Sequence, residues 1–260
     1  MKELDLQEKY LIHFFTERAD GLQYKEVKAN TVSTKFFIVE DLKNFISETS
    51  LNKESYKKLL KTKFNGDEKA LMDKFMDFLN EKIKSSMNMA IFINSNHSVT
   101  FEGYKLYLFY PSGAVSSEDK HFEENIFSVV QELPYTYKHV GIKQFAFRPD
   151  LTFFLNGIFL GYSELKSNWN NQNAKKHGVK KVAKDYHKAV SSYLALADGN
   201  DVTQTIKKDF LKIFEKAIHI TSTDVNDTYI IRNISIHFDN VKKFGDYDYD
   251  KYYNAISKDF

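Results

Sequence analysis

The 260-residue chain contains no cysteine. This absence excludes disulfide bonds, thiolate metal sites, iron–sulfur clusters and a cysteine nucleophile. Proline and glycine are scarce, with three and ten residues, which excludes a collagen-like chain or a disordered chain rich in these residues. Neither sign of charge is in large excess, because 37 Lys and Arg face 35 Asp and Glu. The net charge of +2 predicts no partner, so any basic surface must be local.

Long hydrophobic runs are absent as well. No uncharged apolar stretch reaches the about 18 residues of a membrane span, and the opening MKELDLQEKYLIHFF carries charges throughout, unlike a signal peptide. The signatures of a P-loop NTPase, an HExxH metalloprotease, a GxSxG hydrolase and an EF-hand are also missing. We therefore expect a cytoplasmic protein that makes no membrane contact and belongs to none of these four classes.

The composition that remains is ordinary for a globular protein, with 42% hydrophobic and 28% charged residues. Apolar residues at helical spacing predict a short helix within 27–46 and longer helices over 5–18, 53–64, 67–85 and 178–197. β-branched and aromatic runs predict strands over 99–110, 126–130, 217–223 and 228–238. Interleaved strands and helices predict an α/β fold, with a central mixed β-sheet flanked by helices and a helical elaboration over 40–98.

The segment QFAFRPDLTFFLNGIFLGYSELKS contains two apolar runs joined by Asn156-Gly157. Asn-Gly between apolar runs is a strong hairpin signal because both residues tolerate positive φ. The strands are expected over 148–155 and 158–166. Both are apolar at nearly every position, which predicts that the hairpin lies inside a covered sheet.

This hairpin brings candidate catalytic residues to one end. Asp150 begins the first strand, and Glu164 and Lys166 end the second, two residues apart on one face. A two-residue turn places Asp150 opposite Ser163, whereas one extra residue in the second strand places it opposite Glu164. We expect that extra residue as a bulge at Gly161. If Gly161 lies in a regular ladder, the pairing must come from a wider turn or from strand twist.

Two carboxylates at a strand end form a hard-oxygen site suited to Mg²⁺, and a lysine beside them can hold a water or stabilise a charged transition state. Together they suit metal-assisted hydrolysis of a phosphodiester. The alternative reading is a solvated strand end with Asp150 as a cap. Glu-x-Lys also occurs at 26–28 and 118–120, so the tripeptide alone does not decide between the two.

The segment FRPDLTFFLNGIFLGYSELKS resembles the PD-(D/E)xK nuclease core as it occurs in the restriction (R, HsdR) subunit of type I restriction–modification enzymes. In that family an aspartate, an apolar strand, Asn-Gly, a second apolar strand and Glu-Leu-Lys follow in this order, as they do here. Weaker similarity covers residues 7–15, 124–132 and 218–234. The resemblance implies a nuclease domain over 1–245 with its catalytic core at 124–197. Residues 246–260 are then a tail, or the start of a linker to an ATP-driven motor that is absent here.

The resemblance also implies roles for single residues. Asp150 and Glu164 become metal ligands, the Leu165 carbonyl a further ligand, and Lys166 the catalytic lysine. Glu8 matches a glutamate of the family's opening helix, although a glutamate in the first turn of a helix is also favoured by the helix dipole.

One departure from the family's pattern concerns the helix after the hairpin. The family has Gln-x3-Tyr there; Tyr186 fits the tyrosine, but Val182 stands at the glutamine. Lys181 or Lys184 are candidates to substitute for it. Two interpretations of Tyr186 remain open: it is a residue of the catalytic site, or it is a core residue on the apolar stripe of this helix.

A cluster of lysines follows the hairpin, and we expect it to contact DNA phosphates, which position DNA without reading sequence. Its alternative reading is the solvated face of an amphipathic helix. The cluster comprises Lys175, Lys176, Lys180, Lys181, Lys184 and Lys188.

Three functional hypotheses follow. The first is a Mg²⁺-dependent endodeoxyribonuclease domain of a type I restriction R subunit, active in defence against foreign DNA. Its expected partners are double-stranded DNA and the methylation and specificity subunits, with ATP needed only by the motor. The second is a stand-alone restriction or repair nuclease of the same superfamily. The third is a docking module that keeps the fold without catalysis.

Overall fold

The computed structural model describes residues 10–17, 21–86, 89–112, 120–136, 146–167, 171–186 and 216–231. The described helices are α2 (His13–Thr16), α3 (Val39–Glu48), α4 (Lys53–Phe64), α5 (Glu68–Ser85), α6 (Met89–Ser95), the 3₁₀ turn Ala29–Thr31 and the π-helical turn Ala174–Gly178. The described strands are β1 (Lys25–Glu26), β2 (Ser98–Phe101), β3 (Tyr104–Tyr107), β4 (Phe127–Gln131), β5 (Tyr135–Thr136), β6 (Ala146–Phe147), β7 (Leu151–Leu155), β8 (Ile158–Leu165), β9 (His219–Thr223) and β10 (Thr228–Ile231).

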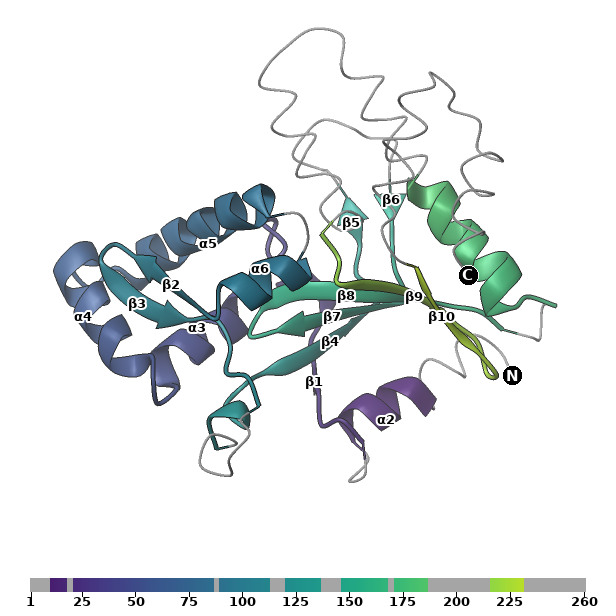
Figure 1. Cartoon of the computed structure of the whole chain (residues 1–260), viewed down its shortest axis with the longest axis horizontal. Coiled ribbons are helices and arrows are strands. Elements are labelled where there is room, and N and C mark those ends of the chain that lie inside the picture. The colour runs from purple at the N-terminus through teal and green to yellow at the C-terminus, as the bar shows by residue number, and fades with distance from the viewer. Residues whose placement is uncertain are drawn as a thin grey trace, which may run out of the picture. The chain divides into compact units, whose positions relative to one another are not determined.

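A mixed six-stranded sheet forms the centre of the fold, as the sequence predicts (Figure 1). Its strand order is β1-β4-β7-β8-β9-β10. The β1–β4 and β8–β9 pairs are parallel, whereas β9 and β10 are antiparallel. The α/β fold class is therefore confirmed.

The predicted hairpin is β7–β8, and its turn is the expected two-residue one. Asn156 and Gly157 have φ of 50° and 76°, the left-handed conformation that this turn requires. The Asn156 side chain is fully buried, accepts a hydrogen bond from the Ile126 N–H at 2.7 Å and donates to the Leu108 carbonyl at 2.9 Å. Almost every residue of the two strands is buried, which confirms the covered sheet.

Gly161 lies in a regular ladder with β9, which runs without interruption from Gly161–His219 to Leu165–Thr223. A Cβ at this position would overlap the His219 carbonyl oxygen, so the close approach of β9 explains the glycine. The bulge expected at Gly161 is not seen on the β9 side. The turn has only two residues, so it is not widened either. The remaining explanations for the contact of Asp150 with Leu165 are the twist of the hairpin strands or an irregularity in β7.

The chain divides into two compact units. The second unit, Tyr24–Val130 with Phe153–Leu160, contains α3–α6 and a large apolar core. Two of its helices, α4 and α5, match the prediction closely. Asn65 and Gly66, both with positive φ, follow α4, and Asp67 caps α5 by accepting a hydrogen bond from the Ala70 N–H at 3.0 Å.

One prediction in this unit is wrong. The single strand expected over 99–110 is the antiparallel hairpin β2–β3, which turns at Glu102-Gly103. Both turn residues have positive φ, 50° and 87°, so a second tight turn interrupts what reads as one alternating run. Figure 1 shows this hairpin beside α4.

The first unit comprises Met1–Gln23, Gln131–Thr152 and Gly161–Phe260, of which only the ranges given above are described. After β8 the chain enters the π-helical turn Ala174–Gly178, which continues as an α-helix to residue 186; we call residues 174–186 the site helix, drawn in green in Figure 1. Asp224 fixes its beginning by accepting a hydrogen bond from the Ala174 N–H at 2.7 Å. Gly178 lets the helix approach β9, because a Cβ there would overlap the Ser222 hydroxyl.

Some predictions fall outside the described residues. These are Glu8, Lys188, the tail 246–260 and the outer parts of the helix 178–197 and the strand 228–238. Among the described residues, no helix combines the length and apolarity needed to cross a bilayer.

Candidate active site

Asp150 stands directly before β7, and two backbone hydrogen bonds hold it there. Its carbonyl oxygen accepts a hydrogen bond from the Glu132 N–H at 2.9 Å. Its carboxylate oxygen Oδ2 accepts one from the Leu165 N–H at 2.6 Å. The aspartate is therefore attached to the last residue of β8, next to Glu164.

Glu164 and Lys166 form a buried pair at the same strand end. The Glu164 side chain is 1% exposed, and the Lys166 side chain is 7% exposed. Lys166 Nζ lies 2.6 Å from Glu164 Oε1 and donates a second hydrogen bond to the Leu165 carbonyl at 2.6 Å. The backbone N–H of Lys166 donates to the Thr223 carbonyl at 2.8 Å, so β9 fixes the strand end. The structure thus brings Asp150, Glu164 and Lys166 together.

Lys181 of the site helix joins this cluster. Its Nζ lies 2.5 Å from the second oxygen of Glu164, Oε2, and 3.7 Å from Oδ2 of Asp185. The same ammonium lies 5.8 Å from the centre of the Phe147 ring, a cation–π distance. Both oxygens of Glu164 are therefore bonded to lysine ammonium groups.

Burial decides the direction of the pKa shift of Asp150, whereas neighbouring carboxylates decide that of Lys181. Burial raises the pKa of Asp150 to about 7, and the charge of Glu164 acts in the same direction. The Leu165 N–H, Lys181 and Lys166 oppose this rise without cancelling it. For Lys181, burial lowers the pKa, but the charge and hydrogen bond of Glu164, with Asp185 and Asp150, raise it overall.

The donor set at this strand end suits a hard cation. Its oxygens are the Asp150 and Glu164 carboxylates and the Leu165 carbonyl, which are the ligand types that Mg²⁺ prefers. The Lys166 ammonium donates hydrogen bonds to two of these groups, the Glu164 carboxylate and the Leu165 carbonyl. Only two of the three oxygen donors are carboxylates, and no cluster of three or more His, Asp or Glu side chains suitable for a metal occurs in the described part of the chain.

Comparison with known families decides the identity. A family model described as the type I restriction enzyme R protein N terminus matches residues 5–222. The chain belongs to this family. The match includes the β7–β8 hairpin and the site helix, and it confirms the resemblance drawn from the residues around the hairpin. No curated protein and no solved structure matches the chain.

The site helix of this R-protein N-terminal domain carries the residues expected to match the family's Gln-x3-Tyr. Val182, which the resemblance places at the glutamine, is fully buried. Of the two lysines considered as substitutes, Lys181 reaches Glu164, whereas Lys184 is exposed. Tyr186 is fully buried, as its reading as a core residue requires, and its role in the site stays a prediction.

The lysines predicted to bind DNA divide into two groups. Lys181 lies half-buried in the candidate site. The other four within the described residues are exposed, namely Lys175, Lys176, Lys180 and Lys184. Lys180 and Lys184 are one helical turn apart and so share a face of the site helix. Their contact with DNA stays a prediction.

Two features of the site were not predicted from the sequence. Asp185 faces Lys181, and the i, i+4 spacing of these two residues was the local signal that could have indicated the pair. Phe147 lies beside Lys181 from a strand that no local pattern predicted. Only folding shows that both lie beside the ammonium group that contacts Glu164.

A cluster of Ser50, His121 and Glu124 in the second unit has the composition of a hydrolase triad but not its geometry. The Ser50 hydroxyl and the Glu124 carboxylate both contact the same ring nitrogen, His121 Nδ1, at 2.9 Å. Ser50 also donates directly to Glu124 at 2.5 Å. A triad needs the serine on one imidazole nitrogen and the carboxylate on the other, so this cluster only fastens the start of α4 to the chain near Glu124.

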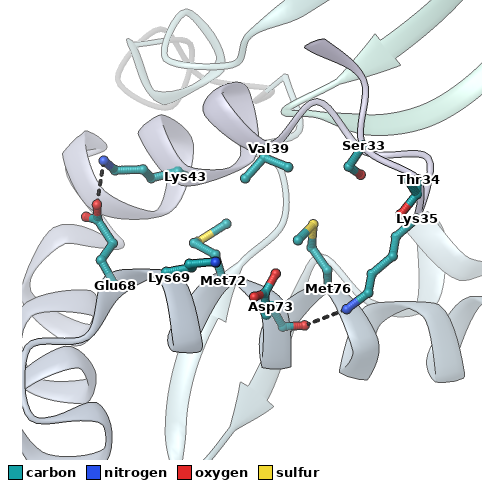
Figure 2. Close-up of a pocket in the computed structure, with 10 residues that line it drawn as sticks. All are labelled: Ser33, Thr34, Lys35, Val39, Lys43, Glu68, Lys69, Met72, Asp73 and Met76. Atoms are coloured by element: carbon teal, nitrogen blue, oxygen red, sulfur yellow. Dashed lines mark hydrogen bonds and ion pairs between the residues drawn. The ribbon is translucent and has the colours of Figure 1, made fainter. Parts of the chain in front are cut away.

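Figure 2 shows a pocket of about 380 Å³ in the second unit, next to α3 and α5. Two of its lysines are already paired: Lys43 with Glu68 at 2.6 Å, and Lys35 with Asp77 at 2.7 Å. Lys35 also donates to the Asp73 carbonyl at 3.2 Å. None of the candidate site residues within the described ranges lines this pocket, and we assign it no function.

Proposed function

We propose that this R-protein N-terminal domain is a Mg²⁺-dependent DNA endonuclease that serves type I restriction of foreign DNA. The observation that carries the proposal is the meeting of Asp150, Glu164 and Lys166 at one strand end, where an ammonium bridges the Glu164 carboxylate and the Leu165 carbonyl. Family membership supports it, because the family is that of the R protein of type I restriction enzymes.

Each residue of the cluster has a role in the proposed reaction. Asp150, Glu164 and the Leu165 carbonyl would hold the cation. A bound Mg²⁺ would supply Lewis-acid chemistry, lowering the pKa of water and offsetting charge on the scissile phosphate. Lys166 orients the attacking water or stabilises the negative charge that develops on the phosphate oxygens. Glu164 and Lys166 are buried away from bulk water. This burial strengthens the attraction of Glu164 for the cation and of Lys166 for the negative phosphate oxygens.

The proposed substrate is the phosphodiester backbone of double-stranded DNA. The proposed protein partners are the methylation and specificity subunits of a restriction complex. The specificity subunit would recognise the DNA sequence. Four exposed lysines on the site helix, which also carries Lys181, supply the positive charge that phosphate binding requires.

The proposal is tested by the metal dependence of cleavage. Supercoiled plasmid DNA should be nicked and linearised by the chain with Mg²⁺ or Mn²⁺, and EDTA should stop the reaction. Glu164→Gln should abolish cleavage and calorimetric Mn²⁺ binding while DNA binding persists, because the amide is a poor ligand for the cation but keeps the shape of the side chain. A wild-type chain that binds neither Mn²⁺ nor Mg²⁺ and cuts nothing would contradict the proposal. Metal binding without cleavage would overturn the nuclease and favour the docking module.

The role of the lysines has a separate test. The double variant Lys180→Ala/Lys184→Ala should bind duplex DNA more weakly at all sequences. The slope of log K against log salt concentration should become shallower by about 2, since each phosphate contact contributes about one unit. The matched control is Lys57→Ala/Lys61→Ala, exposed lysines at the same spacing on α4, which should leave the slope unchanged. Equal effects of both double variants would contradict a specific DNA-binding face.

A further inference from the structure

Glu164 is bonded at both carboxylate oxygens, and its two partners are different lysines. Lys166 contacts Oε1 at 2.6 Å, and Lys181 contacts Oε2 at 2.5 Å. The proposed function requires this same carboxylate to bind a divalent cation. A cation that binds this carboxylate must share its oxygens with the two ammonium groups or displace one of them.

The surroundings of the two lysines indicate which bond is exchanged. The Lys166 side chain is 7% exposed, and its ammonium also donates to the Leu165 carbonyl. The Lys181 side chain is 40% exposed, so water can hydrate its ammonium once the bond to Glu164 is given up. Apart from Glu164, the contacts found for this ammonium are long: 3.7 Å to Asp185 and 5.8 Å to the Phe147 ring centre.

We infer that Lys181 is an exchangeable counter-ion of Glu164: it neutralises the ligand carboxylate in the metal-free protein and gives up its bond when a divalent cation binds. The inference rests on the proposed function. Lys181 is a positioning residue in this role, because it acts on Glu164 rather than on the substrate.

Lys181 also lowers the affinity of the site for cations. Once Asp150 is ionised, Asp150 and Glu164 offer two negative charges, whereas Lys166 and Lys181 bring two positive charges to the same place. A dication must therefore bind against the repulsion of both ammonium groups, and removal of one of them relieves part of that repulsion. The two possible roles of Lys181 therefore predict opposite results. Loss of a counter-ion should tighten cation binding, whereas loss of a structural support would displace Glu164 and weaken cation binding.

The test is calorimetric titration of the full chain with Mn²⁺ and with Ca²⁺ in the absence of DNA. Lys181→Met keeps the stem of the side chain and removes its charge, and it should tighten binding of both ions about tenfold. Lys181→Arg should bind them as the wild type does, because it restores the charge. Lys184→Met, which removes an exposed charge from the same helix, should leave the affinity unchanged.

The outcomes separate this inference from the proposed function. Unchanged or weaker binding by Lys181→Met, with a wild type that binds Mn²⁺ and cuts DNA, would overturn the counter-ion role alone. A wild type and a Lys181→Met variant that both fail to bind either ion would overturn the counter-ion role and the metal-dependent function together. Thermal unfolding without metal checks that each variant is folded before it is titrated.

Discussion

Asp150→Asn should abolish DNA cleavage and at the same time stabilise the metal-free protein. Cleavage should fall by at least about 100-fold, because the variant loses a charged cation ligand. Stability should rise because the wild-type carboxyl is buried beside Glu164 and its ionisation is unfavourable. The asparagine oxygen can still accept the hydrogen bond from the Leu165 N–H, so the local backbone contact is kept.

The stabilisation depends on pH in a defined direction. Burial raises the pKa of Asp150 from 3.8 in its ordinary state to about 7 in the folded protein. The folded state therefore binds the proton more tightly, and wild-type stability falls as pH rises from about 4 to about 7. The uncharged variant lacks this loss. It should match the wild type near pH 4 and exceed it by about 4 kcal/mol at pH 8, at about 1.4 kcal/mol per unit of pKa difference.

Chemical denaturation in EDTA at several pH values measures this difference. Asp224→Asn is the matched control, because the pKa of Asp224 is shifted in the opposite direction. Burial raises this pKa, but hydrogen bonds from the backbone N–H groups of Ala174, Asn226 and Asp227 lower it overall. That variant should be less stable than the wild type at neutral pH and lose the difference in acid. If Asp150→Asn destabilises the protein as Asp224→Asn does, Asp150 has a structural role and the active-site assignment loses its support.

Gly157→Ala should be among the most damaging small substitutions in the second unit. The residue has φ of 76°, which costs an L-residue about 1–2 kcal/mol. A Cβ there would also overlap the Ile38 carbonyl oxygen and lie 2.7 Å from the Leu42 nitrogen, both rigid backbone atoms at the start of α3. The overlap adds about 1–3 kcal/mol, for a total loss of about 2–5 kcal/mol.

Gly103→Ala provides the control, because Gly103 has the same place in the turn of β2–β3. It follows a residue with φ of 50°, as Gly157 does, and has φ of 87° itself. No atom lies within 4 Å of the position that a Cβ would take at Gly103, so only the backbone strain remains. Denaturant unfolding should therefore show a loss of about 1–2 kcal/mol for Gly103→Ala. Equal losses in the two variants would show that the approach of α3 to the hairpin turn is less close than the structure has it.

The elements predicted correctly are those whose signals lie within a few residues. Asn156-Gly157 determines a two-residue turn because both residues tolerate positive φ, and the turn fixes the hairpin. Helix α4 begins and ends where its apolar spacing and Asn65-Gly66 place it. The β2–β3 hairpin was missed because Glu-Gly is a weaker turn signal than Asn-Gly, and the alternation of its two strands runs on through the turn.

The sequence by itself determined the hairpin, the three residues Asp150, Glu164 and Lys166 at its open end, and the family to which the chain belongs. Only the tertiary structure decided that Lys181 rather than Lys184 reaches Glu164, and that burial raises the pKa of Asp150 to about 7. The reason is physical. Turns and helix ends depend on the backbone preferences of neighbouring residues, whereas the partner of a buried charge depends on how segments distant in the chain pack against each other.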